Sequence, residues 1–281
     1  MCHLIYTDTF YMKRKWIRWV SWILLTPIIL FVILMVLLYV PPVQNLLRRE
    51  VTAYASKATG MQIQVERIDL RFPLNLLVRG VEVIQQPDTL LSLESLNVRV
   101  QAWPLIKGKV EVDEVTLSRV AVNSADLMEG MKIKGVLGRF FLQSHGVDLS
   151  NELAVINQVE LSDTHVQLLM NDTTTTPKDT TASAPINWKV ALHQLKLKNV
   201  SFSMQLPADS MRMAAHIGEA AIDDAQADLK NQYYDLKKFL LSGTSASYDT
   251  GTAQPAEGFD ASHIAVRDIR IALDSLLYEG R

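Results

Sequence analysis

The sequence contains a single cysteine, Cys2, among 281 residues. One cysteine forms neither an internal disulfide nor a cysteine-based zinc site, so neither device organises this fold. Aromatic residues make up only 7% of the chain, and the formal net charge is −2. This composition argues against an aromatic-lined catalytic cleft and against the basic surface that nucleic acid requires.

Motifs for catalysis are also missing. The six histidines are not within metal-ligand spacing of one another, and there is no GxSxG, glycine-rich phosphate loop or HExxH. On a strand Asp163 and His165 would share a face, but no serine or cysteine nucleophile is indicated beside them, so a periplasmic hydrolase has little support. Asp223 and Asp224 fit a polar turn. We therefore expect no enzyme, no cofactor and no bound metal.

One long uncharged run stands near the N-terminus. Residues 19–40 read WVSWILLTPIILFVILMVLLYV, which at about 1.5 Å per residue spans a hydrocarbon core of roughly 30 Å. Four basic residues lie within residues 13–18, against Arg48 and Arg49 after the run, which predicts a cytoplasmic N-terminus. We predict a cytoplasmic segment at residues 1–15, a transmembrane helix at 16–40, and a body across the membrane. A cleaved signal peptide, the alternative, would have a shorter apolar region and a small-residue cleavage site.

Residues 41–60 indicate a short amphipathic helix. Apolar residues recur at helical spacing between Val43 and Ala58, and Gly60 is a typical helix end. Two roles fit this pattern. The helix either caps the edge of a sheet, which we favour, or binds a membrane surface.

After Gly60 the apolar period changes to two, which is typical of strands with one buried and one wetted face. An eight-residue pattern, apolar at positions 1, 3, 6 and 8 and polar or glycine at position 5, recurs along the chain. Its copies are LLVRGVEV (76–83), VTLSRVAV (115–122), VELSDTHV (159–166), LKLKNVSF (195–202), IAVRDIRI (264–271) and a weaker AAIDDAQA (220–227). The three-residue step between the apolar pairs predicts a bulge or kink that keeps both pairs on one side.

Residues 61–281 therefore form a β-rich region, largely antiparallel by default. Two segments within it, residues 171–185 and 242–258, are rich in Thr, Ser, Ala, Pro and Gly, and we expect exposed loops there. Residues 225–241 carry leucines at helical spacing and indicate a further helix, with a strand as the alternative.

The run LLSLESLNVRVQAWPLIKGKVEVDEVTLSRVAV, residues 90–122, resembles the AsmA-like and TamB envelope proteins, the latter being the inner-membrane component of the translocation and assembly module. The preceding ATGMQIQVERIDLRF (58–72) fits the same family, and Trp103, Pro104 and Leu105 stand where its members have a Pro-Leu turn. The resemblance covers residues 13–122 well. TamB proteins are much longer and end in a C-terminal domain that these residues lack, so we expect a fragment or a truncated reading frame.

The resemblance implies a bacterial inner-membrane protein with a periplasmic body, an elongated curved sheet, and an apolar groove (a β-taco) that carries phospholipid toward the outer membrane. On that basis we predict that acyl chains contact eight side chains: Val78, Val81, Val83, Val120, Val122, Val166, Val200 and Phe202. The alternative is a structural module that assists outer-membrane protein assembly with a BamA-like barrel partner, by strand addition at an exposed sheet edge.

Overall fold

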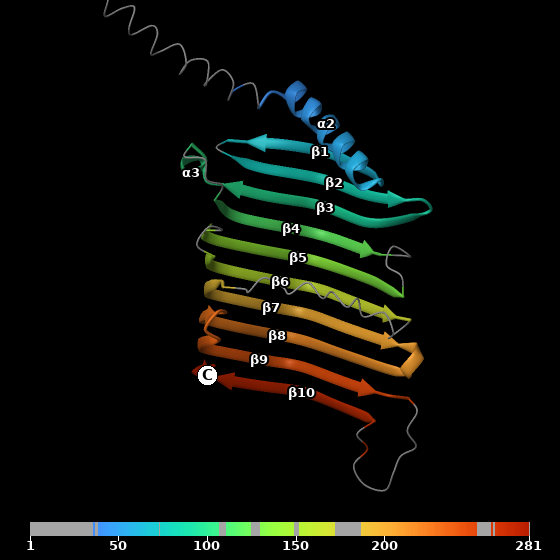
Figure 1. Ribbon diagram of the computed structural model, residues 1–281, viewed down its shortest axis with the longest axis vertical. Helices are drawn as coiled ribbons and strands as arrows, with labels where there is room; N and C mark the ends of the chain where they lie inside the picture. The colour runs from blue at the N-terminus through green and yellow to red at the C-terminus, as the bar shows by residue number, and fades with distance from the viewer. Residues whose placement is uncertain are drawn as a thin grey trace, which may run out of the picture.

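The structure is a computed structural model that describes residues 36, 39–72, 74–106, 111–124, 130–148, 152–171, 187–251, 260 and 262–280. These residues form one open sheet of eleven strands, in which each of the first ten pairs with its neighbours in sequence order (Figure 1). The predicted class, mainly β with an elongated, curved and largely antiparallel sheet, is confirmed.

The strands lengthen along the chain. The first four are β1 (Gln62–Arg71), β2 (Asn75–Gln85), β3 (Asp88–Val100) and β4 (Val112–Asn123). The next five, of 17 or 18 residues each, are β5 (Met131–Asp148), β6 (Leu153–Met170), β7 (Lys189–Leu206), β8 (Met211–Asp228) and β9 (Tyr233–Asp249). The last two are β10 (His263–Leu273) and β11 (Leu276–Glu279), which both pair with β9.

All strand pairs are antiparallel except β6 with β7, which is parallel. A parallel pair needs a crossover of about a dozen residues or more, because the chain must return to the end where it started. The predicted loop at residues 171–185 lies between these two strands, and all of it except Asn171 is outside the described residues. A tight hairpin would have made the pair antiparallel.

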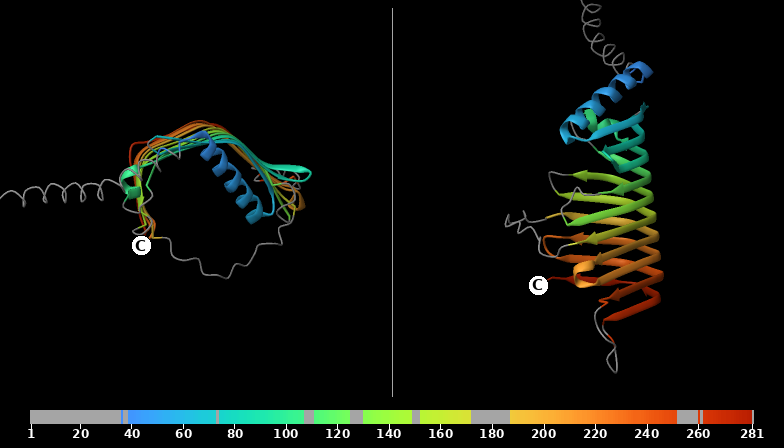
Figure 2. Two further views of the ribbon diagram at one scale, coloured as in Figure 1. Left: turned by 90° about the horizontal axis from the view of Figure 1, so that it is seen from above. Right: turned by 90° about the vertical axis from the view of Figure 1, so that its right-hand side faces the viewer.

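Every strand is bent, and the sheet as a whole forms an arc when seen along its long axis (Figure 2). The fifth residue of each copy of the eight-residue pattern has a positive φ, which ends the regular pleat at that point. These residues are Gly80, Arg119, Asp163, Asn199, Asp268 and, in the weaker copy, Asp224. The predicted kink in each copy is therefore confirmed.

Five of the kinks belong to one line across the sheet. At this line the regular pairing between two neighbouring strands is interrupted, and one residue on each strand is left unpaired. Examples are Gly80 of β2 beside Glu94 of β3, and Arg119 of β4 beside Gly138 of β5. The weaker copy belongs to a second line, where the pairing skips Asp224 opposite His193 and opposite Lys237. The longer strands thus bend twice.

Two predictions for the C-terminal part were wrong. Residues 225–241 are not helical: they end β8, make a turn and begin β9. Residues 242–249, predicted as loop, continue β9. Helical spacing of leucines arose there from a strand, a turn and a second strand in succession.

The helices lie at the margins of the sheet. The predicted amphipathic helix is confirmed as α2 (Pro41–Thr59), which ends at Gly60 with a φ of 70°. The predicted Pro-Leu turn is instead a five-residue helix, α3 (Ala102–Ile106), between β3 and β4. Residues 207–209 form one 3-10 turn between β7 and β8.

The predicted membrane span falls almost wholly outside the described residues, which include only Val36, Tyr39 and Val40 of it. Among the residues that are described, none of the helices combines the length and apolar character needed to cross a bilayer.

Candidate functional site: the apolar face of the sheet

Register places apolar side chains in continuous rows across the sheet. One row crosses β1 to β10 with each member directly opposite the next: Ile63, Val83, Leu91, Val122, Gly135, Val166, Phe202, Ala215, Ala246 and Val266. A second row lies beyond the main kink: Ile68, Val78, Leu96, Leu117, Phe140, Leu161, Leu197, Ala220, Leu241 and Ile271. We call the surface that carries both rows the groove face.

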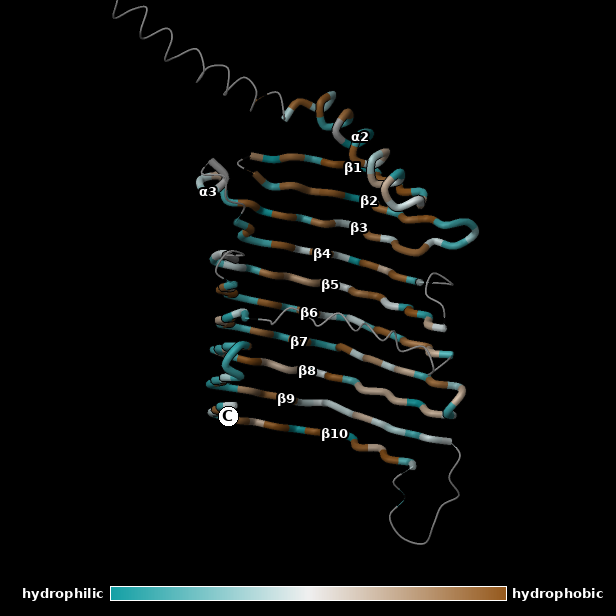
Figure 3. Tube along the Cα trace, in the orientation of Figure 1, coloured by the Kyte–Doolittle hydropathy of each residue, from teal (hydrophilic) through white to brown (hydrophobic). Residues whose placement is uncertain are grey.

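All eight side chains predicted to contact lipid lie on the groove face. Val83, Val122, Val166 and Phe202 belong to the first row and Val78 to the second. The remaining three, Val81, Val120 and Val200, stand between the rows, next to the kink. Figure 3 shows the underlying alternation of polar and apolar residues along the strands.

The groove face is the inside of the bend. Side chains on the inner side of a bend converge. Those beside a kink should therefore be less exposed than the other side chains of the groove face. Beside the kinks, Thr164, Ala220 and Thr244 are only 7%, 5% and 8% exposed. Their strand partners on this face include Leu137, Leu241 and Ile269.

Nothing among the described residues covers this face as a second layer. α2 packs on β1, at one end of the stack, on the inner side of the arc (Figure 2). The sheet holds no large side chain that is fully buried, and Val122, Phe202 and Val266 remain 37%, 41% and 47% exposed. Most domains bury a sheet's apolar face against another layer, so an apolar surface left this open indicates a binding surface.

A shallow hollow of about 230 Å³ indents the groove face between β7 and β10. The small residues Ala215 and Ala246 are among those that line it. The larger side chains around them are Phe202, Met213, Tyr248, Ile264 and Val266. The hollow therefore offers hydrocarbon contacts on several sides and few polar groups.

Past the second kink the groove face continues as a further wall that the sequence did not reveal. Ile156, Leu192, Ala225, Leu236 and Leu276 stand opposite one another across β6 to β11. Tyr234 and Tyr278 lie next to this row with ring centroids 5.9 Å apart. The weaker copy of the eight-residue pattern was the only sign of this wall, because it marks the second kink and not the first.

The residues at the main kink hold the bend by polar contacts between strands. Arg119 forms an ion pair with Glu94 on β3. The Asn199 amide donates to Asp163 Oδ1 at 2.7 Å. Asp163 in turn covers Gly138, where an added Cβ would lie 2.7 Å from the Asp163 Cβ. At the kink, a glycine on one strand thus leaves room for a polar side chain of the next strand, as Gly138 does for Asp163.

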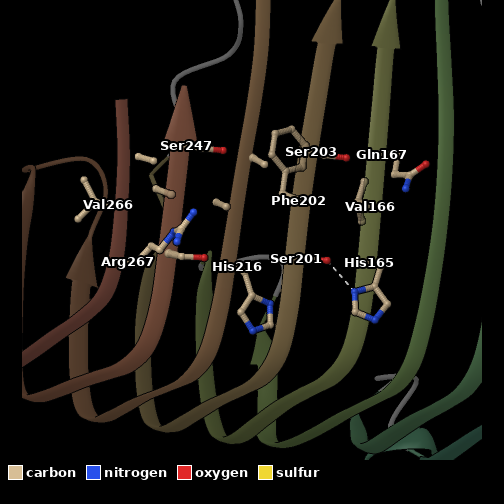
Figure 4. A pocket seen from close by; sticks show the side chains of 15 residues that line it. His165, Val166, Gln167, Ser201, Phe202, Ser203, His216, Ser247, Val266 and Arg267 are labelled. Carbon is tan, nitrogen blue, oxygen red and sulfur yellow. Dashed lines mark hydrogen bonds between the residues drawn. The ribbon is translucent and has the colours of Figure 1, made fainter. Parts of the chain in front are cut away.

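Asp163 and His165 lie on the same strand, β6, and each contacts a residue of β7. The kink at Asp163 breaks the alternation, so Asp163 bonds Asn199 while His165 Nδ1 lies 2.6 Å from Ser201 Oγ on β7 (Figure 4). Sequence reasoning missed Ser201 because it is 36 residues away. This serine and histidine are not joined by a carboxylate, so they do not make a triad.

Asp223 and Asp224 lie within β8 and not in a polar turn. Gln194 donates to Asp223 Oδ1 at 3.4 Å, and Asp224 Oδ1 lies 3.0 Å from His193 Nδ1. Over the part of the chain that the structure describes, no three His, Cys, Asp or Glu residues come close enough to hold a metal ion.

Among the described residues, three groups have a shifted pKa, and each shift has a local hydrogen bond as its main cause. The pKa of Asp228 is lowered, chiefly because the Asn231 backbone N–H donates to its carboxylate at 3.1 Å. The pKa of Lys237 is raised by its hydrogen bond to Asp235. The Ser262 hydroxyl and backbone N–H lower the pKa of Asp260. These groups stabilise local geometry and point to no proton-transfer chemistry.

Comparison with protein-family models yields no match, and comparison with curated proteins yields none either. The geometry of the groove face and the sequence therefore provide the grounds for proposing a function.

Proposed function

We propose that the groove face binds the acyl chains of phospholipids and carries them along the stack of strands. The observation that carries this proposal is the first apolar row, which crosses ten strands without a break and lacks a covering layer among the described residues. A lipid chain lying across several strands would meet apolar side chains along its whole length.

Binding of an acyl chain would be favourable because apolar groups of both the lipid and the groove face would leave water. Burying a methylene group stabilises it by about 0.8 kcal/mol relative to water, and exposed side chains such as Phe202 and Val266 would lose contact with water at the same time. Polar headgroups would stay at the open side of the arc. No bond is made or broken, which suits a chain without catalytic motifs.

The expected location completes the proposal. The uncharged run at residues 19–40 would anchor the chain in a bacterial inner membrane and place the sheet in the periplasm. The resemblance of residues 13–122 to AsmA-like and TamB proteins supports the same arrangement, in which lipid moves between inner and outer membranes.

Lipid photo-crosslinking tests the groove directly. A photoreactive residue at Val83 or Val122 should form phospholipid adducts in membranes, because both side chains lie on the groove face. Glu82 and Ala121 are matched controls: each is the neighbour on the same strand with its side chain on the opposite face. Equal adduct yields at the two members of a pair would contradict the proposal.

A second candidate function is tethering of an outer-membrane barrel protein by strand addition. The two edges of the sheet differ: α2 covers the β1 edge, whereas no described element pairs with the outer edge of β10 and β11. An unpaired edge is a template for another strand.

Co-purification separates the two candidates. Tethering predicts that a barrel protein is retained by Val122→Glu, which damages the groove, and lost from a variant that ends at Thr250 and lacks β10 and β11. Retention by the shortened variant would exclude tethering through this edge.

A further inference from the structure

α2 presents two different ridges. One ridge, Gln44, Arg48, Thr52 and Ser56, repeats every four residues and faces the sheet. Gln44 Nε2 donates to the Leu70 carbonyl at 3.0 Å, and Arg48 Nη1 donates to the Glu66 carbonyl at 2.7 Å. The Ile63 N–H donates to Ser56 Oγ at 3.0 Å. The helix is therefore attached to the β1 edge by polar groups.

The apolar residues of α2 form a separate ridge, about a quarter turn away. Val43, Val51, Tyr54 and Ala58 follow one another at intervals of eight, three and four residues, and so share one side of the helix. Val51 is 52% exposed and Tyr54 is 77% exposed. The sheet thus leaves the apolar side of its own capping helix in solvent, which is unusual for a helix that serves only as a cap.

The position of α2 in the chain identifies what covers this ridge. Residues 19–40 form the uncharged run long enough to cross a bilayer, and α2 begins at the next residue, Pro41. A helix that starts where a span ends lies at the membrane surface. Two exposed basic residues, Arg49 and Lys57, add attraction to anionic headgroups.

We propose that α2 lies in the membrane interface with its apolar ridge in the lipid and its polar ridge holding β1. The first strand of the groove face is then fixed at the bilayer surface. The docking itself stands on the contacts of α2, and it rests on the proposed function only in that it would give the groove its source of lipid.

Site-specific fluorescence on the full chain tests the docking. In a Cys2→Ser background, an environment-sensitive label is attached at Val51→Cys or Tyr54→Cys, with the exposed positions Asn45→Cys and Ala53→Cys as controls on other sides of the same helix. The protein is reconstituted in phosphatidylethanolamine and phosphatidylglycerol vesicles. Labels at Val51 and Tyr54 should emit at shorter wavelength and be quenched severalfold more by lipid-borne than by aqueous quenchers. The two controls should show the reverse.

Two outcomes would overturn the proposal. Labels on the apolar ridge that aqueous iodide quenches as strongly as the control labels would place the ridge in water. Labels that neither quencher reaches would show that protein, not lipid, covers the ridge. Repeating the measurement with Val122→Glu keeps the two hypotheses apart, because this change should abolish crosslinking in the groove and leave quenching at Tyr54 intact.

Discussion

The bend of the sheet originates in single residues that accept a left-handed backbone. Glycine adopts positive φ without cost, and Asn and Asp tolerate it better than other residues. The kink positions carry Gly80, Asp163, Asn199 and Asp268, which follows this preference, and Arg119, which does not. The Arg119 ion pair with Glu94 offers a local compensation. The same backbone conformation thus recurs at the kink in several strands of the curved sheet.

Close approach at the kink gives a prediction for two strand glycines. A Cβ at Gly218 would lie 2.8 Å from the Gly243 carbonyl oxygen, and backbone cannot easily move away. Gly218→Ala should destabilise the protein by about 1–3 kcal/mol. Gly135→Ala is the matched control, because its Cβ would meet ordinary contacts at 3.6 Å or more. Denaturant midpoints should fall for the first variant only; equal losses would show that crowding at the kink is not the cause.

The turn after β8 gives a prediction about protonation. Asp228 accepts hydrogen bonds from the backbone and side chain of Asn231 and pairs with Lys189 at 3.3 Å, which together lower its pKa. Because the folded pKa lies below the unfolded one, this contribution to stability is present above the unfolded pKa and is lost as pH falls through the folded pKa.

Asn231→Ala should raise the pKa of Asp228, but not as far as the value of an unperturbed aspartate, since the backbone N–H at position 231 still donates to the carboxylate. An NMR titration of the Asp228 carboxyl measures both values. An unchanged pKa in the variant would show that the Asn231 side chain plays no part.

Among the elements, α2 is the one that closes an edge. Free N–H and C=O groups on an edge strand invite pairing with other chains, and the polar ridge of α2 occupies several of them on β1. This explains how a helix with an exposed apolar side can nonetheless belong to the fold.

The hydrogen bond from Ile63 to Ser56 makes that closure measurable. Ser56→Ala removes the acceptor, and a lost hydrogen bond of this kind costs about 0.5–1.5 kcal/mol. Hydrogen exchange at the Ile63 amide should therefore speed up by up to about tenfold, while Ser56→Thr, which keeps a hydroxyl, should change it little. Unaltered exchange in Ser56→Ala would mean that α2 does not protect this edge.

At the level of elements, the sequence predicted more of the regular sheet than of its exceptions. The eight-residue pattern located the main kink in β2, β4, β6, β7 and β10 because the three-residue step is a local property. The parallel pairing of β6 with β7 was not predicted, since alternation is the same in either direction. The second bend was signalled only by the weaker copy, at Asp224, because Asn157, His193 and Lys237 on the neighbouring strands do not stand in copies of the pattern.

The sequence predicted which side chains share the groove face, because that depends on local features of each strand. Whether Val83, Val122 and Phe202 share a face follows from alternation and the kink, both of which are local. That no described element covers the face is a property of the whole fold, because it depends on how all the strands and helices are arranged. The contact between His165 and Ser201 joins neighbouring strands and required the register.

At the scale of the whole molecule, the sheet is built by repetition. Each strand contacts mainly its two neighbours, so stability comes from nearest-neighbour pairing and not from a central core, as in other repeat architectures. The rows of the groove face lengthen as strands are added, while the bend keeps them on the inside. The length of the groove face and the stability of the fold thus come from the same repeated unit.

Lipid content of the purified protein tests the open apolar groove most directly. Val122→Glu places a charge in the first row, whereas Ala121→Glu places the same charge one residue away on the opposite face. Mass spectrometry should find phospholipid with the wild-type protein and Ala121→Glu, and severalfold less with Val122→Glu at equal folded content. Equal lipid in both variants, or none in the wild-type protein, would contradict a groove that holds acyl chains.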